Sequence, residues 1–565
     1  MFVSYDPIKC AKLIHHYLTH MVDPNEDNLP YWLILPNRKP AEAAHCRVDD
    51  AELVGSWYEG LLAAMQMLST DEGSDVLASF RRHLMASWGE SGLRFCKKYP
   101  WTHTVHASFH EMGYILSALN ALLTQNPLDE EAAGRAEGLV HGMKNLVIER
   151  KMKTFWSGDF LEKEPVYEFP NDVYLPGRGF DLSRHSGRGE ACIRNAVILQ
   201  PLVCYYERTK DPVALDLAQG IANHLLGVSH YFNFKMEYFG HVHSAVWFAW
   251  GLAGLGRVMG DAHYVEKAKA IYDYTRSISS SFGWVPEYAQ WNPLSEEHCE
   301  TCCIRDMILC ALELIRCGYS VYWDDVNRFA RNQLAENQIR YTGYVVCDNE
   351  IPDHNGITYH EIDQRMLGGY TGGSEPNTIS LSRFRSVAGC CAGTAPVALK
   401  AVWDHVFSME NGTYVANIPC NKEDSICRLC SQIPNDGALS LTVKRDGLFG
   451  FRRYEWMKEA EFTVNGIPIM PEPNGEIIKT MLKKGDVWKI SFPITTKQVR
   501  ETVRDNSYTV LYRACDVVDL LPHGDHIWLY QRDLSVPPYY PKPEEVHESG
   551  ASNFGPTQQW MIKDK

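Results

Sequence analysis

The chain has 565 residues, of which 45% are hydrophobic and 22% charged, and these values exclude a disordered or fibrous protein. Its 55 Lys and Arg against 70 Asp and Glu leave a formal net charge of −15, which opposes binding to nucleic acid because both carry negative charge. We therefore expect a folded protein whose main partner is not nucleic acid.

Apolar runs and cysteines bear on the expected compartment. The longest uninterrupted apolar run, 245–256, is well short of the roughly 20 residues that cross a bilayer. Residues 1–10 lack a basic region followed by an apolar stretch, and the 17 cysteines are odd in number and scattered, which indicates reduced thiols. We expect a cytoplasmic protein without a membrane span.

Apolar residues recur at three- and four-residue spacing through most of the first 340 residues, which is typical of helices that bury one face. The pattern predicts helices over 51–68, 108–123, 191–206, 242–258 and 301–317. A partner helix of about 15 residues follows most of them, and its start is marked by an Asp suited to the N-cap. These residues are Asp75, Asp129, Asp211, Asp261 and Asp324.

A sixth helical unit is expected to start near Ala392. Helical hairpins recur about every 50 to 80 residues. Because one such hairpin cannot bury its apolar face alone, the hairpins must stack into a solenoid or a ring. Six pairs favour closure, so the sequence predicts an (α/α)6 barrel over 1–411. The long connections 156–189 and 346–389 are expected to line one mouth of the barrel.

Beyond residue 412 the helical pattern gives way to short runs rich in Val, Thr, Ile and Tyr, with turn signals such as Asn465-Gly466 close by. The runs are 413–418, 438–443, 461–469, 488–492 and 508–512. They predict a C-terminal antiparallel β-sandwich over 412–565, with an extended tail rich in Pro and Tyr at 537–543. We expect two domains, first α and then β.

Two clusters of cysteines, at 299–303 and 390–391, lie far apart in the sequence and favour a metal site. Thiolates, with a carboxylate as an acceptable fourth ligand, suit a tetrahedral zinc ion. Spacing leaves two donor sets open, because either Cys299 or Glu300 could join Cys302 and the adjacent pair. The alternative is that these thiols are small buried hydrophobes. The spacing of Cys427 and Cys430 has no matching pair beyond Cys420, and we do not expect zinc there.

Glu287 lies among aromatic residues in the stretch 284–291, which ends at Trp291. Such surroundings disfavour the ionised carboxylate, as a general acid requires, and aromatic rings also suit a sugar-binding platform. The alternative is a solvated glutamate in a loop. Glu287 is therefore a candidate general acid.

Histidines gather at two expected helix starts, 103–110 and 241–243. Alternate residues cannot share one helical face, so we expect His241 and His243 to flank a helix start rather than to act as a pair of ligands. His241 and His106 are the candidates for substrate contact, with the structural alternative that each is a satisfied buried ring.

Three segments resemble glycoside hydrolase family 127, the zinc-dependent β-L-arabinofuranosidases that use a cysteine nucleophile. Glu300-Thr301-Cys302 is similar to the family's metal segment, Gly389-Cys390-Cys391 to its paired cysteines, and 240–245 to a helix start with an active-site histidine. A weaker likeness at 462–466 is to a hairpin of the family's β-sandwich. The family commonly has Pro-Pro-Asn after the cysteine pair, whereas this chain has Ala-Gly-Thr at 392–394, which bears on sugar specificity.

The resemblance implies a retaining exo-glycoside hydrolase that releases a terminal sugar, with β-L-arabinofuranose as the expected one. It implies Zn²⁺ as the cofactor and Cys390 as the nucleophile. The implied zinc ligands are Glu300, Cys302, Cys390 and Cys391. The implied acid/base is Glu287, with Glu296 and Glu297 as alternatives, and the implied substrate contacts are His241, His106 and Trp291.

Two other functions stay open at this stage. One is another carbohydrate enzyme on the same barrel, such as an epimerase or an unsaturated-uronyl hydrolase. The other is a sugar-binding protein without catalysis, in which four protein ligands close a structural zinc site. Each takes an oligosaccharide or glycoside as its partner, without nucleic acid or membrane, and a homodimer is left open.

Overall fold

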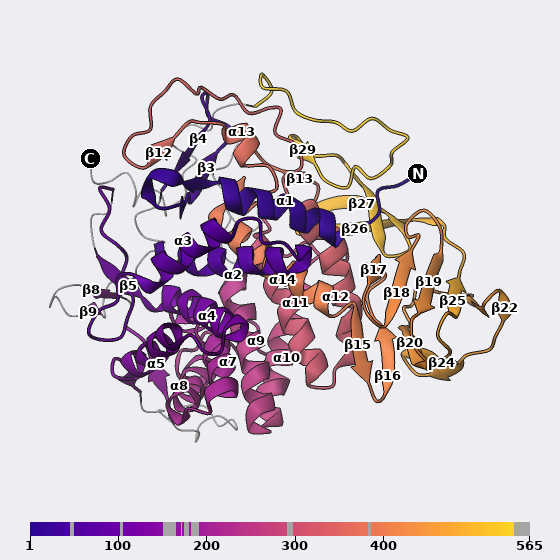
Figure 1. The fold of residues 1–565 in the computed structure, drawn as a ribbon, viewed down its shortest axis with the longest axis horizontal. Helices are drawn as coiled ribbons and strands as arrows, with labels where there is room; N and C mark the ends of the chain where they lie inside the picture. The colour runs from indigo at the N-terminus through magenta and orange to yellow at the C-terminus, as the bar shows by residue number, and fades with distance from the viewer. Residues whose placement is uncertain are drawn as a thin grey trace.

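The computed structural model describes residues 1–45, 50–101, 105–150, 165–170, 172–174, 180–181, 191–290, 298–381 and 386–546. A block made mainly of helices extends to Asp404, and a group of strands follows from Phe407. Figure 1 shows the helices around the centre of the molecule and the strands β15 to β25 beside them on the right.

Most helices form consecutive pairs, as the sequence predicts. The pairs are α2 (Asp50–Leu68) with α3 (Ser74–Met85), α4 (Phe109–Gln125) with α5 (Glu130–Lys144), α7 (Leu199–Thr209) with α8 (Pro212–Asn223), α9 (Val242–Met259) with α10 (Ala262–Ser277), and α11 (Thr301–Arg316) with α12 (Trp323–Phe329). Further helices are α1 (Pro7–His20), α6 (Ala191–Asn195), α13 (Ile362–Arg365) and α14 (Gly389–Asp404).

The first helices of these five pairs, together with α14, pack against one another in a ring. The order of contact is α2, α4, α7, α9, α11, α14 and back to α2. The helix that accompanies α14 is α1, which packs against both α14 and α2. Periodicity could not predict this pairing, because α1 and α14 lie at opposite ends of the helical block and share no hairpin.

Two details of the predicted helices are corrected. The helix expected over 191–206 is interrupted between α6 and α7, where the Asn195 side chain accepts a hydrogen bond from Phe169 N–H at 2.7 Å. Asp129, Asp211 and Asp261 cap α5, α8 and α10, because each side chain accepts a backbone N–H. Asp75 and Asp324 are not N-caps but the second residues of α3 and α12. They lie in the first turns of these helices, where the helix dipole favours negative charge.

Short strands surround the helix ring. They are β1 (Val22–Asp23), β2 (Leu29–Pro30), β3 (Leu33–Leu35), β4 (Glu42–Ala44), β5 (His106–Ser108), β6 (Ile148–Glu149), β7 (Tyr167–Glu168), β8 (Asp172–Tyr174), β9 (Phe180–Asp181), β10 (Gly240–His241), β11 (Tyr288–Ala289), β12 (Ile357–Thr358), β13 (Thr378–Ile379) and β14 (Val387–Ala388). Strands β5, β10 and β14 run directly into α4, α9 and α14. Their pairing with β8, β11 and β3 therefore fixes where these three helices begin.

The C-terminal strands form three sheets. The five-stranded sheet contains β15 (Phe407–Glu410), β16 (Thr413–Ala416), β20 (Gly447–Arg452), β24 (Ile477–Leu482) and β23 (Glu472–Asn474). The six-stranded sheet contains β17 (Lys422–Glu423), β18 (Cys427–Ser431), β19 (Ala438–Val443), β25 (Val487–Ser491), β21 (Glu461–Val464) and β22 (Ile467–Pro468). The three-stranded sheet contains β26 (Thr496–Val503), β27 (Asn506–Arg513) and β28 (Asp516–Leu521).

The pairing within these sheets is antiparallel, as expected, except that β16 and β20 pair in parallel. Phe451 of β20 packs on Trp488 of β25 with ring centroids 4.7 Å apart, so the five- and six-stranded sheets contact each other. Cys427 and Cys430 lie three residues apart on β18, and because successive residues of a strand point to opposite faces, these two side chains lie on opposite faces of the sheet. Their spacing therefore does not form a metal knuckle.

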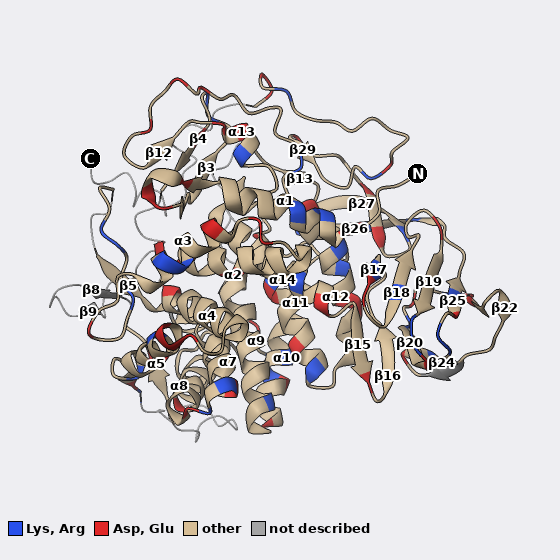
Figure 2. Ribbon diagram, viewed as in Figure 1, with Lys and Arg blue, Asp and Glu red and all other residues tan. Residues whose placement is uncertain are grey.

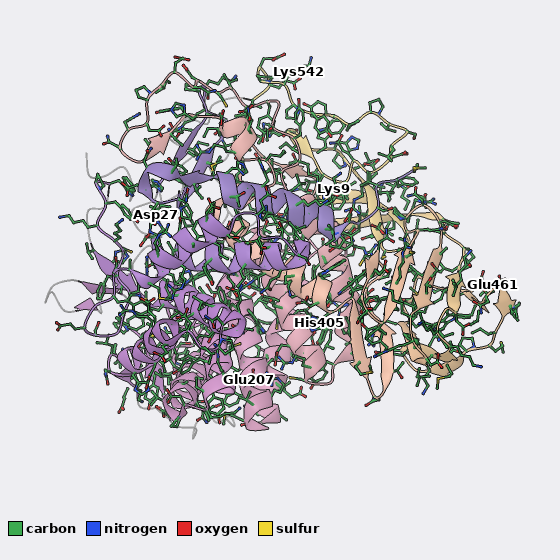
Figure 3. All side chains as sticks on the ribbon, in the orientation of Figure 1. Lys9, Asp27, Glu207, His405, Glu461 and Lys542 are labelled. Carbon is green, nitrogen blue, oxygen red and sulfur yellow. The ribbon has the colours of Figure 1, made fainter. Side chains whose placement is uncertain are left out.

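The helical block and the strands are joined closely. His405, labelled in Figure 3, follows α14 directly, and its ring lies 6.4 Å from that of Trp323 at the start of α12. The last strand, β29 (Ile527–Trp528), returns to pair with β13. Acidic and basic residues are interspersed over both parts (Figure 2). Among the described residues, no helix combines the length and apolar character needed to cross a membrane.

Candidate functional site

The two cysteine clusters of the sequence meet at the starts of two neighbouring helices. Glu300 is the N-cap residue of α11 and Cys302 lies in its first turn, whereas Cys390 and Cys391 lie in the first turn of α14. α11 and α14 are adjacent in the ring. The topology therefore brings together residues that are far apart in the sequence.

These four residues, which we call the Glu300 cluster, form a compact group. One ligand atom of each lies within 4.8 Å of those of the others. Cys391 Sγ is 3.5 Å from Cys302 Sγ and 4.0 Å from Cys390 Sγ, and Cys390 Sγ is 3.7 Å from Glu300 Oε1. Two sulfurs on one tetrahedral zinc, with bonds of about 2.3 Å, lie about 3.8 Å apart. The spacing and the donor types therefore fit zinc.

The fourth member of the cluster is Glu300 and not Cys299. Cys299 Sγ lies 3.8 Å from Asn337 Nδ2 instead. Of the two donor sets that the sequence left open, the structure brings together the one with three sulfurs and one oxygen.

The three thiols of the cluster differ in their electrostatics. Burial raises the pKa of Cys302 and of Cys391 well above the ordinary value, because a buried site disfavours the thiolate. Hydrogen bonds from these two thiols lower the pKa of Cys390, despite its burial. Cys390 is therefore the thiol whose ionised form its neighbours favour.

His241 and Glu287 adjoin the cluster through a two-stranded sheet. β10 and β11 place His241 opposite Tyr288, and Val242 N–H donates to Glu287 O at 2.9 Å. His241 Nε2 lies 3.0 Å from Glu300 Oε2. The Glu287 carboxylate is buried, and one of its oxygens lies within 4.8 Å of ligand atoms of both His241 and Glu300. One carboxylate, that of Glu300, thus contacts Cys390 with one oxygen and His241 with the other.

Other predicted residues lie elsewhere or outside the described residues. Trp291, Glu296 and Glu297 fall in the undescribed stretch 291–297, and most of the expected mouth loop 156–189 is also outside. His106 is buried in β5, where its ring groups with Cys96 and Glu111 rather than with the Glu300 cluster. That His106 contacts substrate stays a prediction.

Sequence reasoning missed a buried polar chain beside the cluster. His243 Nδ1 pairs with Asp306, and His243 Nε2 lies 2.9 Å from Tyr114 Oη. Arg305 Nη1 donates to Asp306 at 2.6 Å, and the guanidinium lies 4.1 Å from the centre of the Trp247 ring. Burial lowers the pKa of His243, but the Asp306 carboxylate outweighs it and the net pKa is raised. The sequence signal that could have indicated this chain is the adjacent charged pair Arg305-Asp306 inside a largely apolar helix.

The prediction that His241 and His243 do not act as one ligand pair is supported by these contacts. His241 reaches Glu300, whereas His243 reaches Asp306. Their ring planes are 85° apart. The two histidines therefore serve different parts of the site.

Comparison with solved structures shows similar folds at low sequence identity. A GH127 beta-L-arabinofuranosidase from Geobacillus stearothermophilus T6 matches with a TM-score of 0.56 and 15% identity, over 83% of this chain and 76% of that one. A second GH127 beta-arabinofuranosidase matches with a TM-score of 0.60 and 15% identity, over 83% and 75%. A protein described as a glycoside hydrolase matches with a TM-score of 0.56 and 13% identity, over 88% and 84%.

In sequence, neither a protein-family model nor a curated protein matches the chain. The structural likeness therefore concerns the fold, and it confirms the resemblance to family 127 at that level.

Proposed function

We propose that the protein is a retaining exo-glycoside hydrolase that releases a terminal sugar, with β-L-arabinofuranose as the expected one. The observation that carries the proposal is the placement of two reactive groups close to Glu300. Cys390 Sγ lies 3.7 Å from Glu300 Oε1, and the Glu287 carboxylate lies within 4.8 Å of a Glu300 oxygen. A double-displacement glycosidase requires a nucleophile and a proton donor in one site, and both groups here adjoin Glu300.

The Glu300 cluster would hold zinc through its three sulfurs and one carboxylate oxygen. When bound, zinc favours the thiolate form of its cysteine ligands at neutral pH. The lowered pKa of Cys390 relative to its two neighbours agrees with this role, because hydrogen bonds already favour its thiolate.

In the first displacement, the Cys390 thiolate attacks the anomeric carbon and forms a carbon–sulfur bond. The bond from that carbon to the leaving oxygen breaks, and the Glu287 carboxyl gives its proton to this oxygen. The ring nitrogens of His241 lie 3.0 Å from Glu300 Oε2 and 3.1 Å from Ser244 Oγ, so His241 would contact the sugar by exchanging one of these two partners for a sugar hydroxyl.

In the second displacement, the ionised Glu287 takes a proton from water, and the water oxygen attacks the same carbon. The carbon–sulfur bond breaks and returns the Cys390 thiolate. Two inversions at one carbon retain its configuration.

Two finer features of the fold belong to the same proposal. The closed order of contacts from α2 to α14, with α1 as the outer partner of α14, supports an (α/α)6 barrel over 1–411. The contact of Phe451 with Trp488 supports a β-sandwich over 412–565. The return of β29 to β13 means that these two domains would share strands.

The proposal is tested with a panel of nitrophenyl glycosides that includes the β-L-arabinofuranoside. Cys390→Ala should lower kcat/KM by about 10³-fold or more, because no nucleophile remains. Cys303→Ala is the matched control, since Cys303 is buried next to Cys302 in the first turn of α11 but is not part of the Glu300 cluster. Wild-type turnover in Cys390→Ala would exclude the mechanism.

The role of Glu287 as the acid is tested by how the rate depends on the leaving group. Glu287→Gln should lower kcat/KM by about 10²- to 10⁴-fold on a poor leaving group and by much less on a good one, which needs no protonation. An equal loss on both substrates would exclude Glu287 as the acid.

One observation favours a second candidate function. Four protein donors fill a tetrahedral zinc ion, as in structural sites. A sugar-binding protein without catalysis would show calorimetric binding of arabinosides, retained zinc and no hydrolysis of any glycoside in the panel.

A further inference from the structure

A second group of potential ligands, which we call the Cys96 cluster, consists of Cys96, His106 and Glu111. One ligand atom of each lies within 4.8 Å of those of the other two. All three side chains are buried, with exposed fractions of 2%, 7% and 2%. The cluster shares no residue with the Glu300 cluster and has no part in the proposed hydrolysis.

The backbone holds these three residues firmly. Cys96 N–H donates to His106 O at 2.9 Å, so the segment that carries Cys96 lies directly against β5. β5 runs without a break into α4, and Glu111 lies in the first turn of that helix. Phe95 N–H donates to Ser87 O at 2.9 Å, which ties the same segment to the chain that follows α3.

The distances fit a single ion. Cys96 Sγ lies 3.8 Å from Glu111 Oε2. A sulfur and an oxygen on one tetrahedral zinc, at about 2.3 Å and 2.1 Å from it, lie about 3.6 Å apart. The side chains could thus bind an ion with little rearrangement.

The donor types select the metal. A thiolate and an imidazole favour zinc over magnesium or calcium, which prefer oxygen donors throughout. A thiolate and a carboxylate together also balance the charge of a divalent ion. α2 contributes two more buried acids, Asp50 and Glu52, at its start.

Those two acids have partners of their own. Asp50 pairs with Arg94 at 3.0 Å and accepts Lys97 N–H at 3.3 Å, and Glu52 lies 3.6 Å from His110 Nε2. They therefore border the Cys96 cluster without competing for its ion.

We infer that Cys96, His106 and Glu111 bind a second zinc ion, separate from the one proposed for the Glu300 cluster. Three protein ligands leave one position of a tetrahedral ion for water. The ion would fix the segment 94–97 to β5 and to the start of α4.

Metal analysis of the full-length protein tests this inference directly. The wild type, loaded with zinc and dialysed against zinc-free buffer, should hold two zinc ions per chain by mass spectrometry. Cys96→Ala should hold one, Cys391→Ser should hold one, and the double variant should hold none. Cys204→Ala, which removes a thiol of α7 remote from both clusters, is the control and should hold two.

Replacing zinc with Co²⁺ tests whether the Cys96 sulfur is a metal ligand. In the Cys391→Ser background, Co²⁺ should give a sulfur-to-cobalt absorption band that Cys96→Ala abolishes. Glu111→Gln, the milder change, should keep the native circular dichroism spectrum and weaken Co²⁺ binding at least about 10-fold.

One zinc per chain in both the wild type and Cys96→Ala would overturn the second site. That result would leave the hydrolase proposal intact, because glycosidase activity and the zinc count of Cys391→Ser are measured separately. A Cys96→Ala variant that folds and still holds two ions would overturn it as well.

Discussion

Two buried polar centres of this protein are built in opposite ways. The first is the Glu300 cluster. The second, which we call the Arg331 network, joins the helical block to the strands through Arg331, Glu336, Asp516 and Arg532. Arg331 Nη1 lies 2.6 Å from Asp516 Oδ2, and Arg532 reaches Asp516 Oδ1 at 3.1 Å and Glu336 Oε1 at 2.8 Å.

The difference lies in where the compensating charge comes from. In the Arg331 network each carboxylate meets an arginine of the same chain, and Arg532 and Arg340 lower the pKa of Glu336 despite its burial. The Glu300 cluster gathers thiols and a carboxylate, which could ligate a cation and cannot neutralise one another. Burial alone therefore does not identify a functional site, but the sign and type of its donors do.

The largest stability effect is expected in the Arg331 network. Asp516→Asn removes the charge that pairs with two buried arginines, so the free energy of unfolding should fall by about 3–5 kcal/mol. Asp519→Asn on the same strand is the control, because Asp519 is partly exposed and pairs with His523, and it should change stability by less than about 1 kcal/mol. Urea unfolding measures both, and equal losses would contradict the contrast.

Of these two centres, only the Glu300 cluster should respond to metal removal. In a Cys96→Ala background, with zinc at about 100 times its Kd, chelation should lower the free energy of unfolding by about 2.7 kcal/mol. Cys302→Ser should abolish this response, because one ligand is lost. The Asp516→Asn loss should be the same with and without zinc, since the two centres share no partner. A zinc-dependent loss in Asp516→Asn would show that the two centres are coupled.

Local sequence signals predicted the helix pairs and the strands well. Apolar spacing and aspartate caps place α5, α8 and α10 correctly, because both act within a few residues. The pairing of α1 with α14, the parallel pair β16 and β20, and the return of β29 to β13 were not predicted. Each of these contacts joins segments that are far apart in the sequence and meet only in the folded protein. Local patterns of residues carry no information about such contacts.

The same distinction applies to the sites. The cysteines of the Glu300 cluster were found because thiols are rare and bunched, whereas the choice of Glu300 over Cys299 needed the geometry of the α11 start. The Cys96 cluster has no bunching, since its ligands are spread over 96–111 and meet only when β5 pairs with that segment. The roles of Arg305 and Asp306 were missed because their partners beyond each other, His243 and Trp247, lie on another helix, α9.

The pair of His243 and Asp306 is intermediate between the Glu300 cluster and the Arg331 network. Its charges are paired within the chain, as in the Arg331 network, but one partner is a histidine that can lose its proton. Because the net pKa of His243 is raised in the folded protein, the folded state holds the proton more tightly than the unfolded one. The resulting stabilisation is complete below the ordinary histidine value of about 6.5 and is lost as pH rises through the raised value.

From about pH 6 to about pH 9, the wild type should therefore lose free energy of unfolding relative to His243→Gln, which keeps Asp306 paired with Arg305. We expect this to be the smallest of the three effects, because Arg305 compensates Asp306 at every pH. His230→Asn, at an exposed position with a φ of 54° that asparagine tolerates, should run parallel to the wild type across this range. Parallel curves for His243→Gln would mean that folding does not change the pKa of this histidine, and a wild type that gains stability relative to the variant as pH rises would mean that the fold keeps His243 neutral.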